Sequence, residues 1–189
     1  RAGTLLIDSS TIASQAATLA LTLEKVGTDK GDAGLTFSAA PTTLNVKSVG
    51  NNYIDLTANA TKTLNVSGTG VLKADLTGPA TLETVKVTET AGLTLGDVAA
   101  TVTSVDTSAT TGAVSVTIAG DKATYTGGAG VDTVTLKGAA VAVSKAINLA
   151  GGNDRLVMSD LTDATKVATV DIDGGEGTDT LVLAAASAD

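Results

Sequence analysis

The sequence contains no cysteine, histidine or tryptophan, and it has only one phenylalanine and two tyrosines among 189 residues. Without cysteine and histidine the chain forms no disulfide, no Cys/His zinc site and no Ser-His-Asp triad. A net charge of −8, combined with so few aromatic side chains, argues against nucleic acid as a partner. These absences leave binding and structural roles built from oxygen-bearing and small apolar side chains.

Long hydrophobic runs are also missing. No stretch approaches the ~18 apolar residues that a transmembrane helix needs, so we expect no membrane insertion. The chain begins at Arg1 without a methionine or a signal-like segment, so we expect a fragment of a longer protein. An apolar content of 43% argues against intrinsic disorder.

The residues that are abundant favour strands and tight turns. Threonine, alanine, glycine, valine and leucine dominate, and aspartate outnumbers glutamate by 16 to 4. Threonine and valine favour strands, whereas glycine and aspartate favour turns. The composition therefore predicts an all-β fold with a thin aliphatic core.

Short phrases recur about twenty residues apart. Thr43-Leu44-Asn45-Val46 returns as Thr63-Leu64-Asn65-Val66, and Asp55-Leu56-Thr57 returns as Asp75-Leu76-Thr77. Apolar residues alternate with polar ones on both sides of a recurring glycine turn, which indicates strands with one buried face. The turn glycines are Gly50, Gly70, Gly92, Gly112, Gly130, Gly152 and Gly177.

This near-constant spacing predicts a parallel β-helix, or β-solenoid, of about seven coils. An antiparallel β-sandwich is the alternative, although its hairpins would not require such constancy. Residues 1–34 are expected to form an N-terminal cap or a first irregular coil, with Ser14 to Lys25 a candidate capping helix. Residues 35–126 are expected to form coils without metal turns, and residues 127–189 coils with them.

The last three turns carry a distinct motif. Residues 127–135 and 174–182 both match G-G-x-G-x-D-x-U-x, where U is apolar, and residues 151–156 keep part of it. These segments resemble the RTX calcium-binding repeats of bacterial exported proteins. The Thr/Ala/Val-rich coils around them are similar to surface-layer (S-layer) proteins and large adhesins that carry such repeats. The turns recur here at 22 and 25 residues, whereas contiguous nonapeptides recur every eighteen.

The motif suits Ca²⁺, which takes about six to eight oxygen ligands. Glycines allow carbonyl oxygens to point inward, and an aspartate two residues after the last glycine adds a carboxylate. Three stacked turns would hold two ions, one in each gap. The candidate calcium-binding residues are Gly128, Gly130, Asp132, Gly152, Asn153, Asp154, Asp173, Gly175, Gly177 and Asp179.

The sequence therefore predicts a structural, calcium-binding solenoid segment of a bacterial S-layer protein that is secreted to the cell surface. Its expected partner is itself, in a homo-oligomeric lattice, with cell-surface polysaccharide as a partner of other domains. The alternative is a spacer or binding module of a secreted RTX adhesin.

Two further alternatives come from residues spaced twenty apart. Thr61, Thr81 and Thr101 suggest the threonine ladder of an ice-binding solenoid, and Asp55 and Asp75 suggest the carboxylate pair of a β-helix enzyme. We expect no enzyme, because no cleft residue with a shifted pKa stands out.

Overall fold

The computed structural model describes residues 4–7, 18–37, 41–76, 81–98, 100–137, 143–158 and 170–183. These residues form two parallel sheets of nine and eight strands. The first sheet contains β1 (Thr4–Ile7), β3 (Ala33–Phe37), β5 (Asn52–Thr57), β7 (Val71–Leu76), β9 (Gly92–Asp97), β11 (Val114–Ala119), β13 (Asp132–Lys137), β15 (Arg155–Met158) and β17 (Thr180–Leu183). The second contains β2 (Thr18–Glu24), β4 (Thr43–Val49), β6 (Thr63–Gly68), β8 (Thr84–Glu89), β10 (Ser104–Thr110), β12 (Thr124–Thr126), β14 (Ile147–Asn148) and β16 (Ile172–Asp173).

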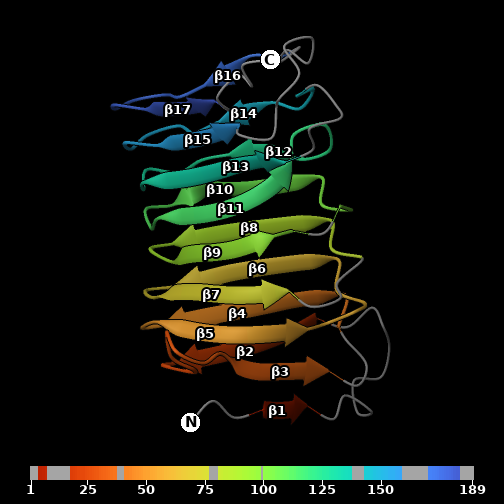
Figure 1. The fold of residues 1–189 in the computed structure, drawn as a ribbon. Coiled ribbons are helices and arrows are strands. Elements are labelled where there is room, and N and C mark those ends of the chain that lie inside the picture. The colour runs from red at the N-terminus through yellow and green to blue at the C-terminus, as the bar shows by residue number, and fades with distance from the viewer. Residues whose placement is uncertain are drawn as a thin grey trace.

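The chain alternates between the two sheets, so that each coil contributes one strand to each of them. Every strand is hydrogen-bonded to the strand two places along the chain, and the coils stack from the N-terminal to the C-terminal end (Figure 1). All the strand pairs are parallel, for example β4 with β6 and β5 with β7. The predicted β-solenoid is thereby confirmed, and the antiparallel sandwich is wrong.

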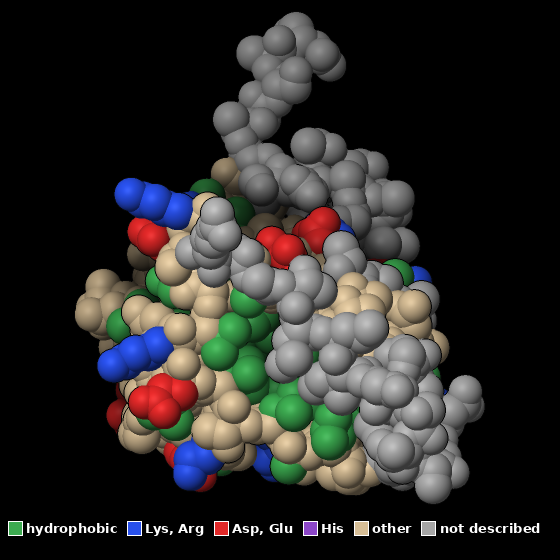
Figure 2. Space-filling view, turned by 90° about the horizontal axis from the view of Figure 1, so that it is seen from below, with side chains coloured by type: hydrophobic (Ala, Val, Ile, Leu, Met, Phe, Trp, Pro, Cys, Tyr) green, Lys and Arg blue, Asp and Glu red, His purple; other side chains and the backbone are tan. Residues whose placement is uncertain are grey.

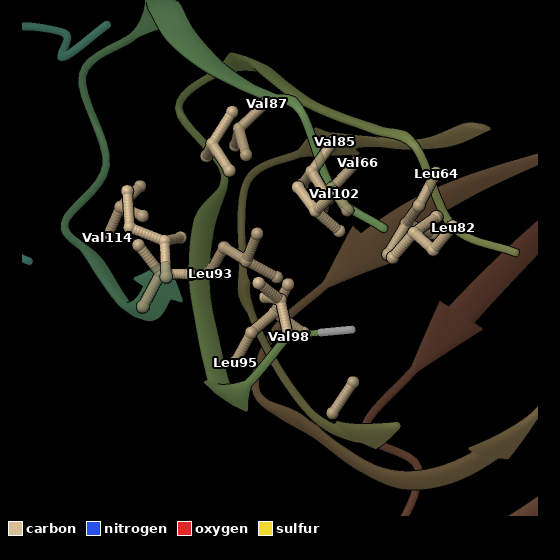
Figure 3. Close-up of a cluster of buried hydrophobic side chains, with 14 of the residues drawn as sticks. Leu64, Val66, Leu82, Val85, Val87, Leu93, Leu95, Val98, Val102 and Val114 are labelled. Carbon is tan, nitrogen blue, oxygen red and sulfur yellow. The ribbon is translucent and has the colours of Figure 1, made fainter. Parts of the chain in front are cut away.

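The twenty-residue repeat sets the register of neighbouring coils. Leu44 lies opposite Leu64, and Asp55 lies opposite Asp75. Equivalent residues of successive coils therefore stack in columns, and apolar residues at alternate positions all face the interior. Leu64 and Val66 are each 1% exposed and belong to one continuous, mainly aliphatic core, in which Leu64 lies beside Leu82 and Val66 beside Val85 (Figure 3).

The corners between the sheets are held by side-chain hydroxyls. The Thr61 hydroxyl donates to the carbonyl of Pro41 at 2.7 Å, and the Thr101 hydroxyl donates to the carbonyl of Leu82 at 2.7 Å. Thr81 makes a similar bond to the carbonyl of Asn59 at 2.9 Å. This column of threonines, considered above for ice binding, therefore joins each coil to the preceding one.

The N-terminal part of the described chain also forms stacked strands, with steps longer than the twenty-residue repeat, because Thr18 lies opposite Thr43 and Thr4 lies opposite Gly34. Strand β2 pairs in parallel with β4, so the predicted helix is wrong for residues 18–24. Leu19, Leu21 and Leu23 stand at alternate positions there, and period-two alternation is typical of a strand. Figure 2 shows this end of the molecule, with hydrophobic side chains in the middle of the face and charged side chains mainly toward its rim. The polar composition of residues 159–166 predicts a turn with Asp160 at its start, and this segment lies outside the described residues.

Candidate functional site: an acidic column in the last turns

The first inward position after each glycine turn forms a column through the solenoid. From the N-terminal to the C-terminal coil it is occupied by an asparagine, three aliphatic residues and three aspartates. In register order the residues are Asn52, Leu72, Leu93, Val114, Asp132, Asp154 and Asp179. We call Asp132, Asp154 and Asp179 the acidic column. The structure therefore brings the three predicted aspartates together.

Each carboxylate of the acidic column accepts a backbone N–H from the coil below. Oδ1 of Asp132 accepts the N–H of Val114 at 3.0 Å. Oδ1 of Asp154 accepts the N–H of Asp132 at 2.7 Å, and Oδ1 of Asp179 accepts the N–H of Asp154 at 3.0 Å. In an aliphatic coil the equivalent N–H of Leu93 donates to the carbonyl of Ala113 at 3.1 Å. The aspartate side chains thus replace a backbone acceptor where the coils stack.

Asn52 makes the same contact without a charge. Its Oδ1 accepts the N–H of Val26 at 2.8 Å, and its amide group donates to the Ser48 hydroxyl at 2.8 Å. Asn52 is fully buried. The two asparagines directly after Gly50 are the signal in the sequence from which this contact could be predicted. Asparagine can therefore occupy this column as a neutral replacement for aspartate.

The two buried aspartates differ in the hydrogen-bond partners of their second carboxylate oxygen, Oδ2. Asp132 and Asp154 are each 1% exposed. Oδ2 of Asp132 accepts the hydroxyl hydrogen of Tyr125 at 2.8 Å. Oδ2 of Asp154 is buried without a hydrogen-bond donor. Asp179 is exposed, so water reaches it. The unsatisfied acceptor of the column therefore lies in its middle turn.

Burial is the main influence on the acidity of these groups. It raises the pKa of Asp132 to about 6, against the hydrogen bonds from Tyr125 and Val114, and the charge of Asp154 raises it further. Burial also raises the pKa of Asp154, and the charge of Asp179 adds to that effect. Removal from water disfavours the charged carboxylate, and neighbouring carboxylates repel one another. The column therefore favours a proton or a bound cation.

The five predicted glycines allow the turns to stack closely. A Cβ atom at Gly128 would overlap the carbonyl oxygens of Thr107 and Thr110. The others would each overlap a carbonyl oxygen of the coil below: Gly130 that of Gly112, Gly152 that of Gly130, Gly175 that of Ala150, and Gly177 that of Gly152. Packing alone thus requires glycine at these positions. It also places a row of carbonyl oxygens against the turns.

Two predicted residues have other partners. Oδ1 of Asn153 accepts the N–H of Thr178 at 2.9 Å, which links two successive turns. Oδ1 of Asp173 accepts the N–H of Gly175 at 3.0 Å, and Asp173 is exposed. Asn148 is its register partner and makes the equivalent bond to the N–H of Ala150. Asp173 thus closes its own turn and does not join the acidic column.

One register assignment from the sequence needs correction. Counting two residues from Gly92, as in the other turns, predicts Thr94 at the position of the aspartates. In the structure Leu93 occupies it, because Leu93 pairs with both Leu72 and Val114. Strand β9 already begins at Gly92, whereas β11 begins two residues after Gly112. Neither Leu93 nor Thr94 has a carboxylate, so the expectation that this turn lacks one stands.

A second group of carboxylates lies on the outside of the nine-stranded sheet. Oxygens of Asp32, Asp55 and Asp75 lie within 4.8 Å of one another. Asp55 and Asp75 are exposed, and Nζ of Lys73 lies 3.6 Å from Oδ2 of Asp32. We call these three aspartates the exterior cluster. Water and Lys73 offset its negative charge, whereas the two buried carboxylates of the acidic column are shielded from water.

The donor set of the acidic column suits a hard divalent cation. Carboxylate and carbonyl oxygens are the ligands that Ca²⁺ prefers. The unpartnered Oδ2 of Asp154 and the nearby carboxylate of Asp179 supply the charge for one ion. The residues present thus fit calcium.

Comparison with known proteins does not identify a family for this chain. No protein-family model, curated protein or solved structure matches this chain. Among the described residues, no helix has the length and apolar character to cross a membrane.

Proposed function

We propose that the last turns bind Ca²⁺ and that the ion holds the C-terminal coils of a structural β-solenoid together. The observation that carries this proposal is the buried Oδ2 of Asp154, which has no donor in the described structure. A buried carboxylate without compensation costs several kcal/mol. A cation removes that cost, so its binding energy becomes folding energy.

Asp154 and Asp179 would supply the carboxylate oxygens, and carbonyls of the surrounding turns would complete the shell. The glycines support this arrangement because they let the backbone of one turn approach the next. When bound, the ion neutralises the carboxylates. The role of the site is therefore structural, with no reaction attached to it.

The proposed setting is a surface-layer protein of a bacterium. The RTX-like turns and the Thr/Ala/Val-rich coils support it, as does the regular stack of coils (Figure 1). The last strand leaves Leu181 and Leu183 more than half exposed, at 56% and 63%. An open apolar coil is a surface for further packing, and neutralised carboxylates reduce repulsion between copies.

The alternative is a spacer or binding module of an RTX adhesin. An aromatic sugar-binding patch would favour a binding module. Tyr125 is 1% exposed and belongs to the core, so of the two tyrosines only Tyr53 is available to such a patch. The burial of Tyr125 therefore favours the structural role.

Calorimetric titration with Ca²⁺ tests the site. We expect a Kd on the order of 10⁻⁴–10⁻³ M, as in extracellular calcium modules. Asp154→Asn should weaken binding at least tenfold, because it keeps the N–H acceptor but removes the charge. Asn52 shows that the column accepts an asparagine. Asp55→Asn is the matched control, since it removes a carboxylate from the exterior cluster.

Three results would count against the proposal. The absence of calcium heat in the unmodified protein would remove it. Equal binding by Asp154→Asn and the unmodified protein would show that the aspartates of the acidic column only accept backbone N–H groups and do not bind the ion. Loss of binding in Asp55→Asn alone would move the ion to the exterior cluster.

Assembly needs a separate experiment on the longer parent protein. We expect light scattering to rise and ordered arrays to appear in electron micrographs as calcium is added. Magnesium is the control for charge screening, because it accepts such carbonyl-rich sites poorly. Equal assembly in magnesium or in chelator would restrict calcium to a role within the chain.

A further inference from the structure

The hydroxyl of Tyr125 lies at the boundary between the aliphatic coils and the acidic column. Tyr125 occupies an inward position on β12, in register with Val105 below and Ile147 above. Its ring spans the interior, and its hydroxyl reaches Asp132 at the start of β13 in the other sheet. It is the largest fully buried side chain in the described structure.

The hydroxyl is held in place by a second buried side chain. The Thr107 hydroxyl lies 3.2 Å from the Tyr125 oxygen and 3.0 Å from the carbonyl oxygen of Thr126, to which it also donates, and Thr107 is fully buried. Burial raises the pKa of the Tyr125 hydroxyl, so Tyr125 stays protonated and donates to Asp132. With the N–H of Val114 on Oδ1, both oxygens of Asp132 have donors.

Asp154 has the same backbone contact but lacks this second donor. The residue above Tyr125 is Ile147, whose side chain has no hydrogen to donate. The difference between a satisfied Asp132 and an unsatisfied Asp154 thus follows from one column of the opposite sheet, where tyrosine gives way to isoleucine. A cation is needed only where the tyrosine is absent.

We infer that Tyr125 sets the lower end of the cation site, so that the acidic column holds one ion, between Asp154 and Asp179, and none beside Asp132. This inference rests on the proposed calcium binding. It replaces the expectation of two ions with a single occupied gap. Tyr125 acts as a neutral substitute for a cation at Asp132.

Equilibrium dialysis against Ca²⁺, with the ions counted per chain, tests this assignment. The unmodified protein should bind one ion. Tyr125→Phe keeps the ring but frees Oδ2 of Asp132, so it should bind two. In chelator its thermal midpoint should fall below that of the unmodified protein, and calcium should restore it. Tyr53→Phe removes the other tyrosine hydroxyl and should change neither result.

A reciprocal variant gives the opposite change. Ile147→Tyr places a hydroxyl one coil higher, toward Asp154, and should reduce the count from one ion to none. Because the larger ring could also disrupt packing, Tyr125→Phe is the deciding variant.

Two ions in the unmodified protein would overturn the inference and leave calcium binding intact. One ion in both the unmodified protein and Tyr125→Phe would overturn it as well. No ion in the unmodified protein would remove the proposed function. In that case an ion gained by Tyr125→Phe would still support the role of Tyr125, whereas none in either protein would remove both claims.

Discussion

Asp132 donates its backbone N–H to the carboxylate of Asp154, one coil away, across 2.7 Å. The same side chains therefore do two things: they satisfy the backbone where coils stack, and they concentrate negative charge inside the solenoid. Hydrogen bonding to a backbone N–H favours a charged carboxylate, whereas burial and neighbouring charges disfavour it. At Asp154, one of the two carboxylate oxygens is buried without a hydrogen-bond donor.

The core of the solenoid predicts a sharp contrast between two neighbouring positions. Leu64→Asp places an unpaired carboxylate in the interior and should unfold the chain, at a cost above about 4 kcal/mol. Lys62→Asp should cost about 1 kcal/mol or less, because Lys62 is a corner residue whose ion pair with Glu83 is half-exposed. Urea unfolding followed by circular dichroism measures both. A folded Leu64→Asp protein would contradict the assigned inward face.

The middle turn contains a strained residue that glycine should relieve. Ala150 has a φ of 68°, where its turn equivalent in the next coil is Gly175 with a φ of 84°. A side chain in this left-handed region costs about 1–2 kcal/mol. Ala150→Gly should therefore raise the free energy of unfolding by about 1 kcal/mol.

Gly175→Ala is the matched control for that substitution. It should destabilise the protein, because its Cβ would overlap the carbonyl oxygen of Ala150. Thermal midpoints of the two variants, measured side by side, are expected to move in opposite directions. A fall in the midpoint of Ala150→Gly would show that the turn is not strained as described.

The raised pKa of Asp132 predicts how the metal-free protein responds to pH. Burial places this pKa at about 6, above the ordinary value of 3.8, so between these values the folded chain binds more protons than the unfolded chain. The free energy of unfolding should therefore rise as pH falls from about 7 to about 4, by up to about 3 kcal/mol. The raised pKa of Asp154 acts in the same direction.

Urea midpoints of chelator-treated protein across this pH range measure the effect. Asp132→Asn is the control, because it removes the titrating group while keeping an acceptor for Val114. Its stability should depend less on pH than that of the unmodified protein. A metal-free protein that loses stability on acidification through this range would contradict the assigned burial of charge.

Much of the fold could be predicted from the sequence because coil stacking forces equivalent residues into register. The inward position of Leu64 follows from alternation. Alternation alone would also turn Lys62 inward, and Lys62 is exposed because the strand begins only at Thr63. The candidate capping helix is wrong for residues 18–24, where the alternate spacing of Leu19, Leu21 and Leu23 indicates a strand. The alternation of apolar residues is therefore sufficient to predict the strands and their inward faces, once the first residue of each strand is known.

The chemistry of the site was harder to predict. The aspartates were found from the motif, but their bonds to backbone N–H groups of the preceding coil depend on the three-dimensional register. The contact between Tyr125 and Asp132 crosses between the sheets, and nothing in the spacing of seven residues indicates it. A side chain's partner across the interior depends on packing, which a one-dimensional pattern does not contain.

Hydrogen exchange of individual backbone amides, in chelator and in millimolar Ca²⁺, tests the central claim most directly. If calcium holds the last coils together, the amides of Asp154 and Thr180 should exchange at least tenfold more slowly with calcium, and magnesium should not reproduce the change. Amides of β4 to β7 should be unaffected. Exchange that is unchanged by calcium, or slowed equally in every coil, would contradict a calcium site in the acidic column.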